Sequence, residues 1–316
     1  MSQVKRIKTS LVLAGGYFAA GLLFLSPAAA QPPGFGAPPD PAWQAEKAGL
    51  TAMSEQYPTA WDLYQHFRSE AEPIMVPKPD EMPDWSGLWT RSIGPIAYDP
   101  DQRNPMQLPA SVTLTPPYEK ELTDRLEAMA RGVDYDPLSV CGTPVGFPRW
   151  FTEPFLREYV PTPKQTWLIL EQQSETRRIY TDGRDHIPED FATPTANGDS
   201  IGFWDGDKLV AHTKYVKPGM IQRNQPQHSD KIEGVEIWQK VDPDTLQVDV
   251  WLYDPEAFVK PWFTRQSYRH VPQPAEGYPL RITFWDCTEN ANNDITKTDE
   301  GASTFTDLTF TEEDDE

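Results

Sequence analysis

The stretch "VEIWQKVDPDTLQVDVWLY", residues 235–253, decides the fold. Two β-like runs, 235–241 and 245–253, flank the turn-forming residues Asp242-Pro243-Asp244. This order of run, turn and run is typical of an antiparallel hairpin. Since alternate residues of a strand share a face, one face of the second run is apolar and the other carries Asp249, Trp251 and Tyr253. In the later run 262–270, aromatic and polar residues stand on both faces. Such faces favour the wall of a barrel with a partly polar lumen over a sandwich with one dry core.

Similar β-like runs occupy the chain on both sides of this hairpin, and turn residues rather than helical patterns separate them. They are "DWSGLWT" early in the chain, then "PFLREYV", "QTWLILEQ", "TRRIYT", "SIGFW", "KLVAHTKY", "KPWFTRQSYRHV" and "LRITFWDC". Strands that follow one another through tight turns pair as a meander. The sequence therefore predicts a mainly β protein, an antiparallel up-and-down barrel of about eight or nine strands.

Helices are expected at two places outside this meander. Residues 41–71 carry apolar side chains at helical spacing with a break at Pro58, and residues 115–131 place Pro116 at a helix start and Gly132 after its end. We expect residues 31–83 to form a Pro-rich leader and an N-terminal helical extension, and residues 84–290 to form the barrel domain, which includes the helix near 115–131. Residues 291–316 are expected to form an acidic tail.

The first residues have the pattern of an export signal. A basic segment precedes the apolar run 11–25, and the small residues Ala28-Ala29-Ala30 follow it. The run falls short of the ~20 residues that span a bilayer. Residues 1–30 are therefore predicted to be a signal peptide that is cleaved near Ala30, which would place the mature protein in the periplasm or outside the cell.

The net charge and the cysteine and histidine residues indicate which binding partners, cross-links and cofactors to expect. The net charge of −20 would repel nucleic acid and anionic membrane surfaces, so neither nucleic acid nor stable membrane insertion is expected. Cys141 and Cys287 are the only cysteines, and in an oxidising compartment they are predicted to form one disulfide. The histidines lack the H-x-H and H-E-x-x-H spacings, so no metal and no other cofactor is expected.

An ordered series of motifs resembles a widespread family of exported bacterial proteins, mostly of unassigned function, with a lipocalin-like β-barrel. The series covers residues 84–290 and consists of "DWSGLWT", "LTPPYEKEL", "CGTPVGFPRW", "RRIYTDGR", "GDSIGFWDGDKLV", "HSD", "VDPDTLQVDVWLYDPEAFVKPW" and "CTEN". The resemblance implies the barrel and the exported location. The chain departs from the pattern at Met220 and Ile221, where a Trp is commonly expected, so an aromatic ligand contact from this loop is in doubt.

Acid–base chemistry on a small molecule is the leading functional hypothesis. We expect His228 to titrate near neutrality. Glu171 shares a strand face with the apolar Trp167 and Ile169, and such surroundings are expected to raise a carboxyl pKa. Arg178 and Tyr180 share a strand face and are expected to point into the lumen, with Arg177 outside; an ion pair between Arg178 and Glu171 is the equally weighted alternative. Proposed catalytic residues are therefore His228, Glu171 and Tyr180, and the expected ligand contacts are Arg178, Arg184, His186, Asp230, Trp262 and Trp204.

The reaction class follows by exclusion of a nucleophile. Ser229 and His228 are sequence neighbours, so in a strand they point to opposite faces and cannot form a catalytic pair. A cofactor-free lyase or isomerase acting on an aromatic or terpenoid molecule fits better than a hydrolase. The alternative is a non-catalytic periplasmic protein that binds a small hydrophobic or aromatic molecule, and a homodimer is compatible with both. A lumen filled by Trp, Leu and Val side chains would count against a ligand there.

Overall fold

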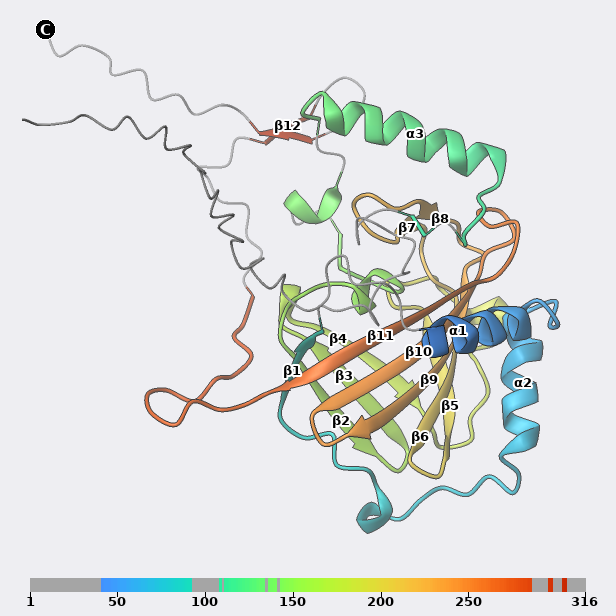
Figure 1. The fold of residues 1–316 in the computed structure, drawn as a ribbon, viewed down its shortest axis with the longest axis vertical. Helices are drawn as coiled ribbons and strands as arrows, with labels where there is room; N and C mark the ends of the chain where they lie inside the picture. Colours follow the sequence, from blue (N-terminus) through green and yellow to red (C-terminus); the bar gives the residue numbers. More distant parts are fainter. Residues whose placement is uncertain are drawn as a thin grey trace, which may run out of the picture.

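The computed structural model describes residues 41–92, 108–109, 111–133, 136–140, 143–285, 295–297 and 303–305. Its centre is a closed barrel of nine strands in the order β1-β11-β10-β9-β6-β5-β4-β3-β2 (Figure 1). The strands are β1 (Leu88–Arg91), β2 (Arg157–Thr162), β3 (Gln165–Leu170), β4 (Glu175–Tyr180), β5 (Asp199–Asp205), β6 (Lys208–Lys214), β9 (Glu233–Asp242), β10 (Thr245–Tyr253) and β11 (Trp262–Val271). The predicted mainly β, up-and-down barrel is confirmed.

One pairing differs from the antiparallel expectation. β4 and β5 run parallel and meet at a single pair, Tyr180 with Ile201, whereas the other neighbouring strands of the barrel are antiparallel. The connection between them, residues 181–198, is long enough to return to the same end of the barrel, so a hairpin is not required there. The barrel wall is therefore weakly joined between β4 and β5.

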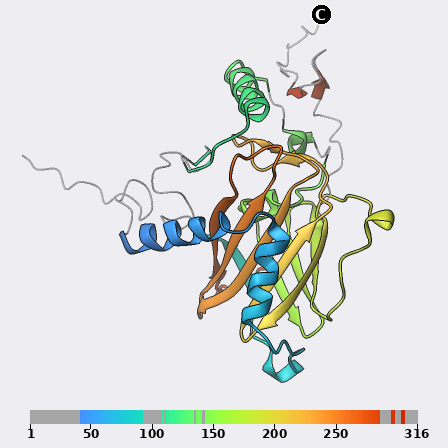
Figure 2. The ribbon, with the colours of Figure 1, turned by 90° about the vertical axis from the view of Figure 1, so that its right-hand side faces the viewer.

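The N-terminal helices cover one side of this wall. α1 (Pro41–Ser54) crosses the barrel and α2 (Ala60–Glu70) runs along it, over β6, β9 and β10 (Figure 2). A second apolar cluster lies under them and includes Leu63, Phe203, Val235, Trp251 and Phe263. The outer faces of β10 and β11 carry Trp251, Tyr253 and Phe263, which these helices cover, together with the ion pair between Asp249 and Arg265.

The remaining elements lie mostly at one end of the barrel. α3 (Pro116–Ala130) lies beyond this end and contacts the small hairpin formed by β7 (Gly219–Met220) and β8 (Gln227–His228) (Figure 1). The 3₁₀ helices are Pro79–Glu81, Pro137–Val140, Arg149–Phe151, Gln172–Ser174 and Glu189–Phe191, and a separate pair of strands is β12 (Ile295–Lys297) and β13 (Ser303–Phe305). Arg125 of α3 donates to the carbonyl oxygens of Arg223 and Gln225, which ties the helix to the β7–β8 hairpin.

Candidate functional site

The interior of the barrel is filled by a segment of its own chain, residues 145–151. Phe147, Trp150 and Phe151 insert from this segment and are almost completely buried. The Trp150 ring packs edge-on against Trp238 and Tyr268, with ring centroids 6.2 and 6.5 Å apart. This part of the interior is therefore a packed core, and the structure gives no support to a ligand held along the barrel axis. Candidate ligand sites lie where the barrel opens to its surroundings.

A buried ion pair crosses the same interior. Arg177 of β4 donates to both carboxylate oxygens of Glu236 on β9, and it also donates to the hydroxyl groups of Ser200 and Thr213. Both charged side chains are at most 1% exposed. The indole Nε1 of Trp238 donates to Glu236 as well, at 2.9 Å. Because the charges are compensated by several donors and acceptors, the interior tolerates them.

The predicted orientation of β4 is wrong. Arg177 points into the barrel, while Arg178 is exposed and Tyr180 is half-buried on the outer side. The Arg178 guanidinium lies 4.4 Å from the centroid of the Trp167 ring on the outer face of β3. Period-two spacing shows which residues share a face but not which face is inside. The choice here follows from Glu236, which offers the interior carboxylate that Arg177 needs.

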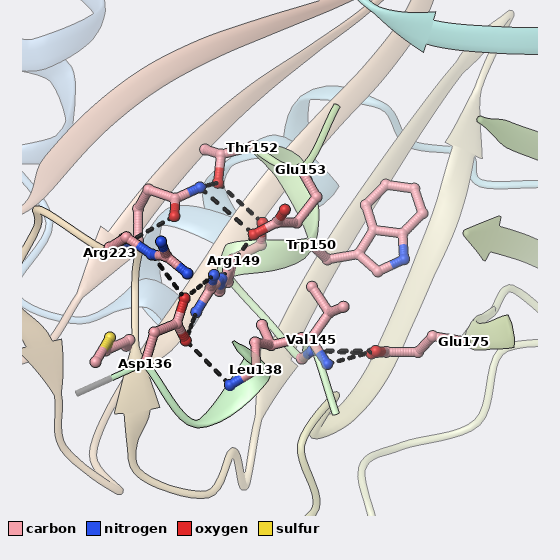
Figure 3. A network of polar contacts seen from close by, with 12 residues as sticks. Asp136, Leu138, Val145, Arg149, Trp150, Thr152, Glu153, Glu175 and Arg223 are labelled. Carbon is pink, nitrogen blue, oxygen red and sulfur yellow. Dashed lines mark hydrogen bonds and ion pairs between the residues drawn. The ribbon is translucent and has the colours of Figure 1, made fainter. Parts of the chain in front are cut away.

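A second polar network holds the inserted segment at the barrel mouth (Figure 3). Arg149 donates two hydrogen bonds of 2.7 Å to Asp136 and one of 2.7 Å to Glu153. Arg223, in the loop between β7 and β8, donates to Asp136 at 3.2 Å. Burial raises the pKa of the Asp136 carboxyl, but the hydrogen bonds and charge of Arg149 outweigh burial and leave it below its ordinary value. The network fixes one side of the pocket described next.

This pocket, the mouth pocket, has a volume of about 340 Å³ and is lined by His228, Gly219, Met220, Phe147 and Arg149 among others. His228 is buried, and its Nδ1 lies 3.1 Å from the carbonyl oxygen of Ser229. A carbonyl only accepts, so Nδ1 carries the proton and Nε2 carries the lone pair of the neutral ring. Nε2 lies beside Gly219, where an added Cβ would come within 3.2 Å of it.

The surroundings of His228 keep its imidazole neutral. Burial lowers the pKa of His228, and the Ser229 carbonyl and the charge of Asp254 only partly offset this. Asp254 accepts hydrogen bonds from the backbone N–H and the hydroxyl of Ser229, at 2.6 and 2.7 Å. The ring is therefore held in one tautomer and presents a basic nitrogen at neutral pH.

Two larger hollows lie elsewhere on the barrel. The first, here called the β4–β5 cleft, has a volume of about 570 Å³, and Arg178, Tyr180, Asn197 and Asp199 contribute to its lining. It follows from the weak joint between the two strands. The second, here called the α2 pocket, has a volume of about 740 Å³ and lies between the start of α2 and residues 253–261.

Glu175 separates the mouth pocket from the β4–β5 cleft. Its carboxylate accepts a hydrogen bond from the backbone N–H of Val145 (Figure 3). It also accepts hydrogen bonds from the Gly146 N–H and from the Asn197 amide. Burial raises the pKa of Glu175 in spite of these donors. The contacts anchor the first residues of the inserted segment, so Glu175 shapes both hollows.

The three predicted catalytic residues do not come together. His228 lines the mouth pocket and Tyr180 lines the β4–β5 cleft. Glu171 accepts hydrogen bonds from the backbone N–H and the hydroxyl of Thr283, at 3.2 and 3.0 Å. The alternative ion pair between Glu171 and Arg178 is not formed in the described structure, because Arg178 lies over Trp167 instead.

The predicted ligand contacts are similarly dispersed. Arg184 pairs with Asp182 and lies over the Tyr180 ring. Asp230 is exposed, pairs with Lys231 and contributes to the α2 pocket. Trp204 and Trp262 are buried members of the interior cluster. His186 contacts His212, a residue that the sequence analysis did not select as a ligand contact.

Several predictions lie outside the described residues, namely the signal peptide at 1–30, the disulfide between Cys141 and Cys287, and most of the acidic tail. Within the described ranges, no helix is long and apolar enough to cross a membrane. The same ranges contain no group of three or more His, Cys, Asp or Glu side chains arranged to hold a metal ion.

Neither a protein-family model nor a curated protein matches the chain. Among solved structures, the chain is similar to a mutant of the fluorescent protein UnaG, with 13% sequence identity and a TM-score of 0.25; the match covers 45% of this chain and 90% of that one. The family suggested by the sequence motifs stays a prediction, and the nine-stranded closed barrel rests on the strand pairing itself.

Proposed function

We propose that this protein binds a small molecule in the mouth pocket, with His228 as the hydrogen-bond acceptor. The observation that carries the proposal is a buried imidazole whose Nδ1 is committed to the Ser229 carbonyl and whose Nε2 is left for a ligand. Leu138, Val145, Phe147 and Met220 make much of the remaining lining apolar. A mainly apolar hollow with one placed polar group is typical of small-molecule sites. The preferred ligand is an aromatic or terpenoid molecule with one hydroxyl group.

Catalysis is the second candidate, and the neutral state of His228 favours it. A ring with a free basic nitrogen in an apolar pocket is suited to remove a proton from a ligand, as a cofactor-free lyase or isomerase requires. Asp254 positions the Ser229 backbone that fixes the tautomer. We also propose that the protein is exported and that it can form a homodimer. These two parts of the proposal are supported by the sequence alone.

Binding is tested with 2-naphthol and naphthalene, which differ by one hydroxyl group. We expect 2-naphthol to bind the full-length protein about 5- to 10-fold more tightly, the ratio given by one hydrogen bond of ~1 kcal/mol. His228→Ala should remove that preference, whereas His66→Ala, on α2, should keep it. Equal preference in wild type and His228→Ala, or no binding of either probe, would contradict the proposed site.

Catalysis is tested separately by deuterium exchange into 2-tetralone, followed by proton NMR. A general base in the mouth pocket should accelerate loss of the proton next to the carbonyl, and His228→Ala should return the rate to that of buffer. If the exchange rate with the wild-type protein equals that in buffer while 2-naphthol still binds, the protein binds the ligand without catalysis and the enzyme hypothesis is rejected.

A further inference from the structure

Four ionisable side chains form a continuous set of contacts outside the barrel interior, and we call them the His–His chain. His186 Nδ1 lies 2.7 Å from Asp199 Oδ2, and His186 Nε2 lies 2.7 Å from His212 Nδ1. The other nitrogen of His212, Nε2, lies 3.1 Å from Glu233 Oε2. The two imidazoles are almost fully buried, with side chains 5% and 0% exposed. Each contact is short enough to require a hydrogen.

The His–His chain lies between two of the hollows and beneath a helix. Asp199 lines the β4–β5 cleft, and Glu233 lines the α2 pocket. Trp61 and Tyr64 of α2 rest on the His212 ring, with ring centroids 5.3 and 5.6 Å away. The chain of contacts therefore joins β5, β6 and β9 directly under the helix that borders the α2 pocket.

Counting hydrogens fixes the charge of the set. Three contacts join carboxylate, imidazole, imidazole and carboxylate, so three hydrogens are needed, one in each contact. Two neutral imidazoles carry only two N–H hydrogens, and ionised carboxylates carry none. With two hydrogens one contact would bring two lone pairs together; with four, two N–H groups would face each other between the rings. The arrangement is complete only with one excess proton on the two rings.

The environment indicates which ring is charged. Burial lowers the pKa of His212, and the hydrogen bond and charge of Glu233 only partly offset this, so this ring stays neutral and donates through Nε2 to Glu233. The hydrogen bond from His186 keeps the pKa of Asp199 below its ordinary value despite burial. The excess proton thus belongs to His186, which forms an ion pair with Asp199.

Other charged or titratable groups lie near the set. They are Lys214 on β6, Asp182, Arg184 and Asp185 in the loop before His186, and Arg68 and the neutral phenol of Tyr64 on α2. Lys214 opposes a further positive charge on His212. Because Asp199 and Glu233 are themselves in contact with the rings, they are the strongest stabilisers of a single positive charge.

We propose that the His–His chain is a proton-dependent contact that holds α2 against the barrel and so controls the α2 pocket. In the intermediate protonation state all three contacts form and α2 rests on a rigid surface. Loss of the excess proton leaves two hydrogens in the set, and uptake of a further proton gives four. Either change breaks one contact and loosens the helix that borders the pocket. The proposal concerns a different hollow from the mouth pocket and does not depend on the function assigned to His228.

The proton count is tested by nitrogen-15 NMR of the histidine rings in the full-length protein at neutral pH. We expect three of the four ring nitrogens of His186 and His212 to be protonated. Two or four protonated nitrogens would overturn the proposal directly.

The mechanical consequence is tested by hydrogen exchange of the α2 amides across pH, corrected for intrinsic exchange. Protection should fall about 10- to 100-fold on both sides of an intermediate pH range, as expected for loss of a hydrogen bond to a charged group. Protection that does not vary with pH would contradict the proposal.

Two matched variants separate the effect of the His–His chain from a general effect of negative charge near α2. Asp199→Asn keeps an oxygen acceptor but removes the charge, so the alkaline limit of the protected range should move down by about one to three pH units. Asp230→Asn removes an exposed charge from the α2 pocket and should leave the limit unchanged. Equal shifts in the two variants, or no shift in Asp199→Asn, would refute the role of the His–His chain.

Discussion

At the scale of single residues, Arg177 shows what the alternation of residues along a strand can predict and what it cannot. The spacing correctly groups Arg177 apart from Arg178 and Tyr180, but the direction of each group depends on partners that lie far away in the sequence. Glu236 is 59 positions from Arg177, and its carboxylate is 0% exposed. The sequence identified the strand that contains Glu236 but gave no signal that two strands would share one buried ion pair.

The ion pair makes a specific stability prediction. Arg177→Met should lower the free energy of unfolding by about 3–5 kcal/mol, because Glu236 would remain buried without its counter-charge. The double variant Arg177→Met with Glu236→Gln should recover most of that loss. Urea denaturation measures both, and a double variant no more stable than the single one would show that packing rather than charge is responsible.

His228 lies in β8, and its proposed role stays a prediction. The contact between His186 and His212 could not be predicted, because the two are 26 positions apart and meet only through the parallel arrival of β5 beside β4. Sequence spacing detects neighbours on one element. It does not detect side chains that meet across elements.

At the scale of elements, the tight turns carried most of the information. Asp242-Pro243-Asp244 and Asp205-Gly206-Asp207 join strands that pair as expected, β9 with β10 and β5 with β6. Where the connection is long, as between β4 and β5, the sequence had no local turn to fix the direction of the next strand. The two faces of β10 were told apart, but the face that carries Trp251 and Tyr253 points outward under α1 and α2 and does not line a polar lumen.

α2 begins with a defined cap, which gives a prediction at this scale. The Thr59 hydroxyl accepts a hydrogen bond of 3.1 Å from the Asp62 N–H. Thr59→Ala should therefore lower the free energy of unfolding by about 1 kcal/mol, whereas Thr59→Ser should stay close to wild type. Thermal or urea denaturation of both variants is the measurement, and equal losses would indicate that the hydroxyl is not the cause.

At the scale of the whole molecule, His228 links stability to pH. Burial lowers its pKa, so below about pH 6.5 the unfolded chain binds a proton that the folded protein does not. Its contribution is complete above that pH and is lost as the pH falls toward the folded value. The loss amounts to at most about 1.4 kcal/mol per pH unit.

His228→Gln tests this linkage. Urea denaturation at pH 7 and pH 5 should show a smaller difference between the two pH values in the variant than in wild type, because the variant lacks the titrating ring. Other groups, including Glu175 with its raised pKa, act equally in both proteins and cancel. If the stability difference between pH 7 and pH 5 is identical in the two proteins, His228 takes up its proton as easily in the folded protein as in the unfolded chain.

The closure of the barrel has a consequence for the order in which the chain is made. β1, near residue 90, completes the wall by pairing with β11, near residue 270, and α1 also packs on β11. A ribosome therefore releases both the first strand and the first helix long before their shared partner exists. Until residues 262–271 have been synthesised, the apolar sides of α1 and β1 have no native surface to cover them, which gives chaperones a reason to hold the nascent chain.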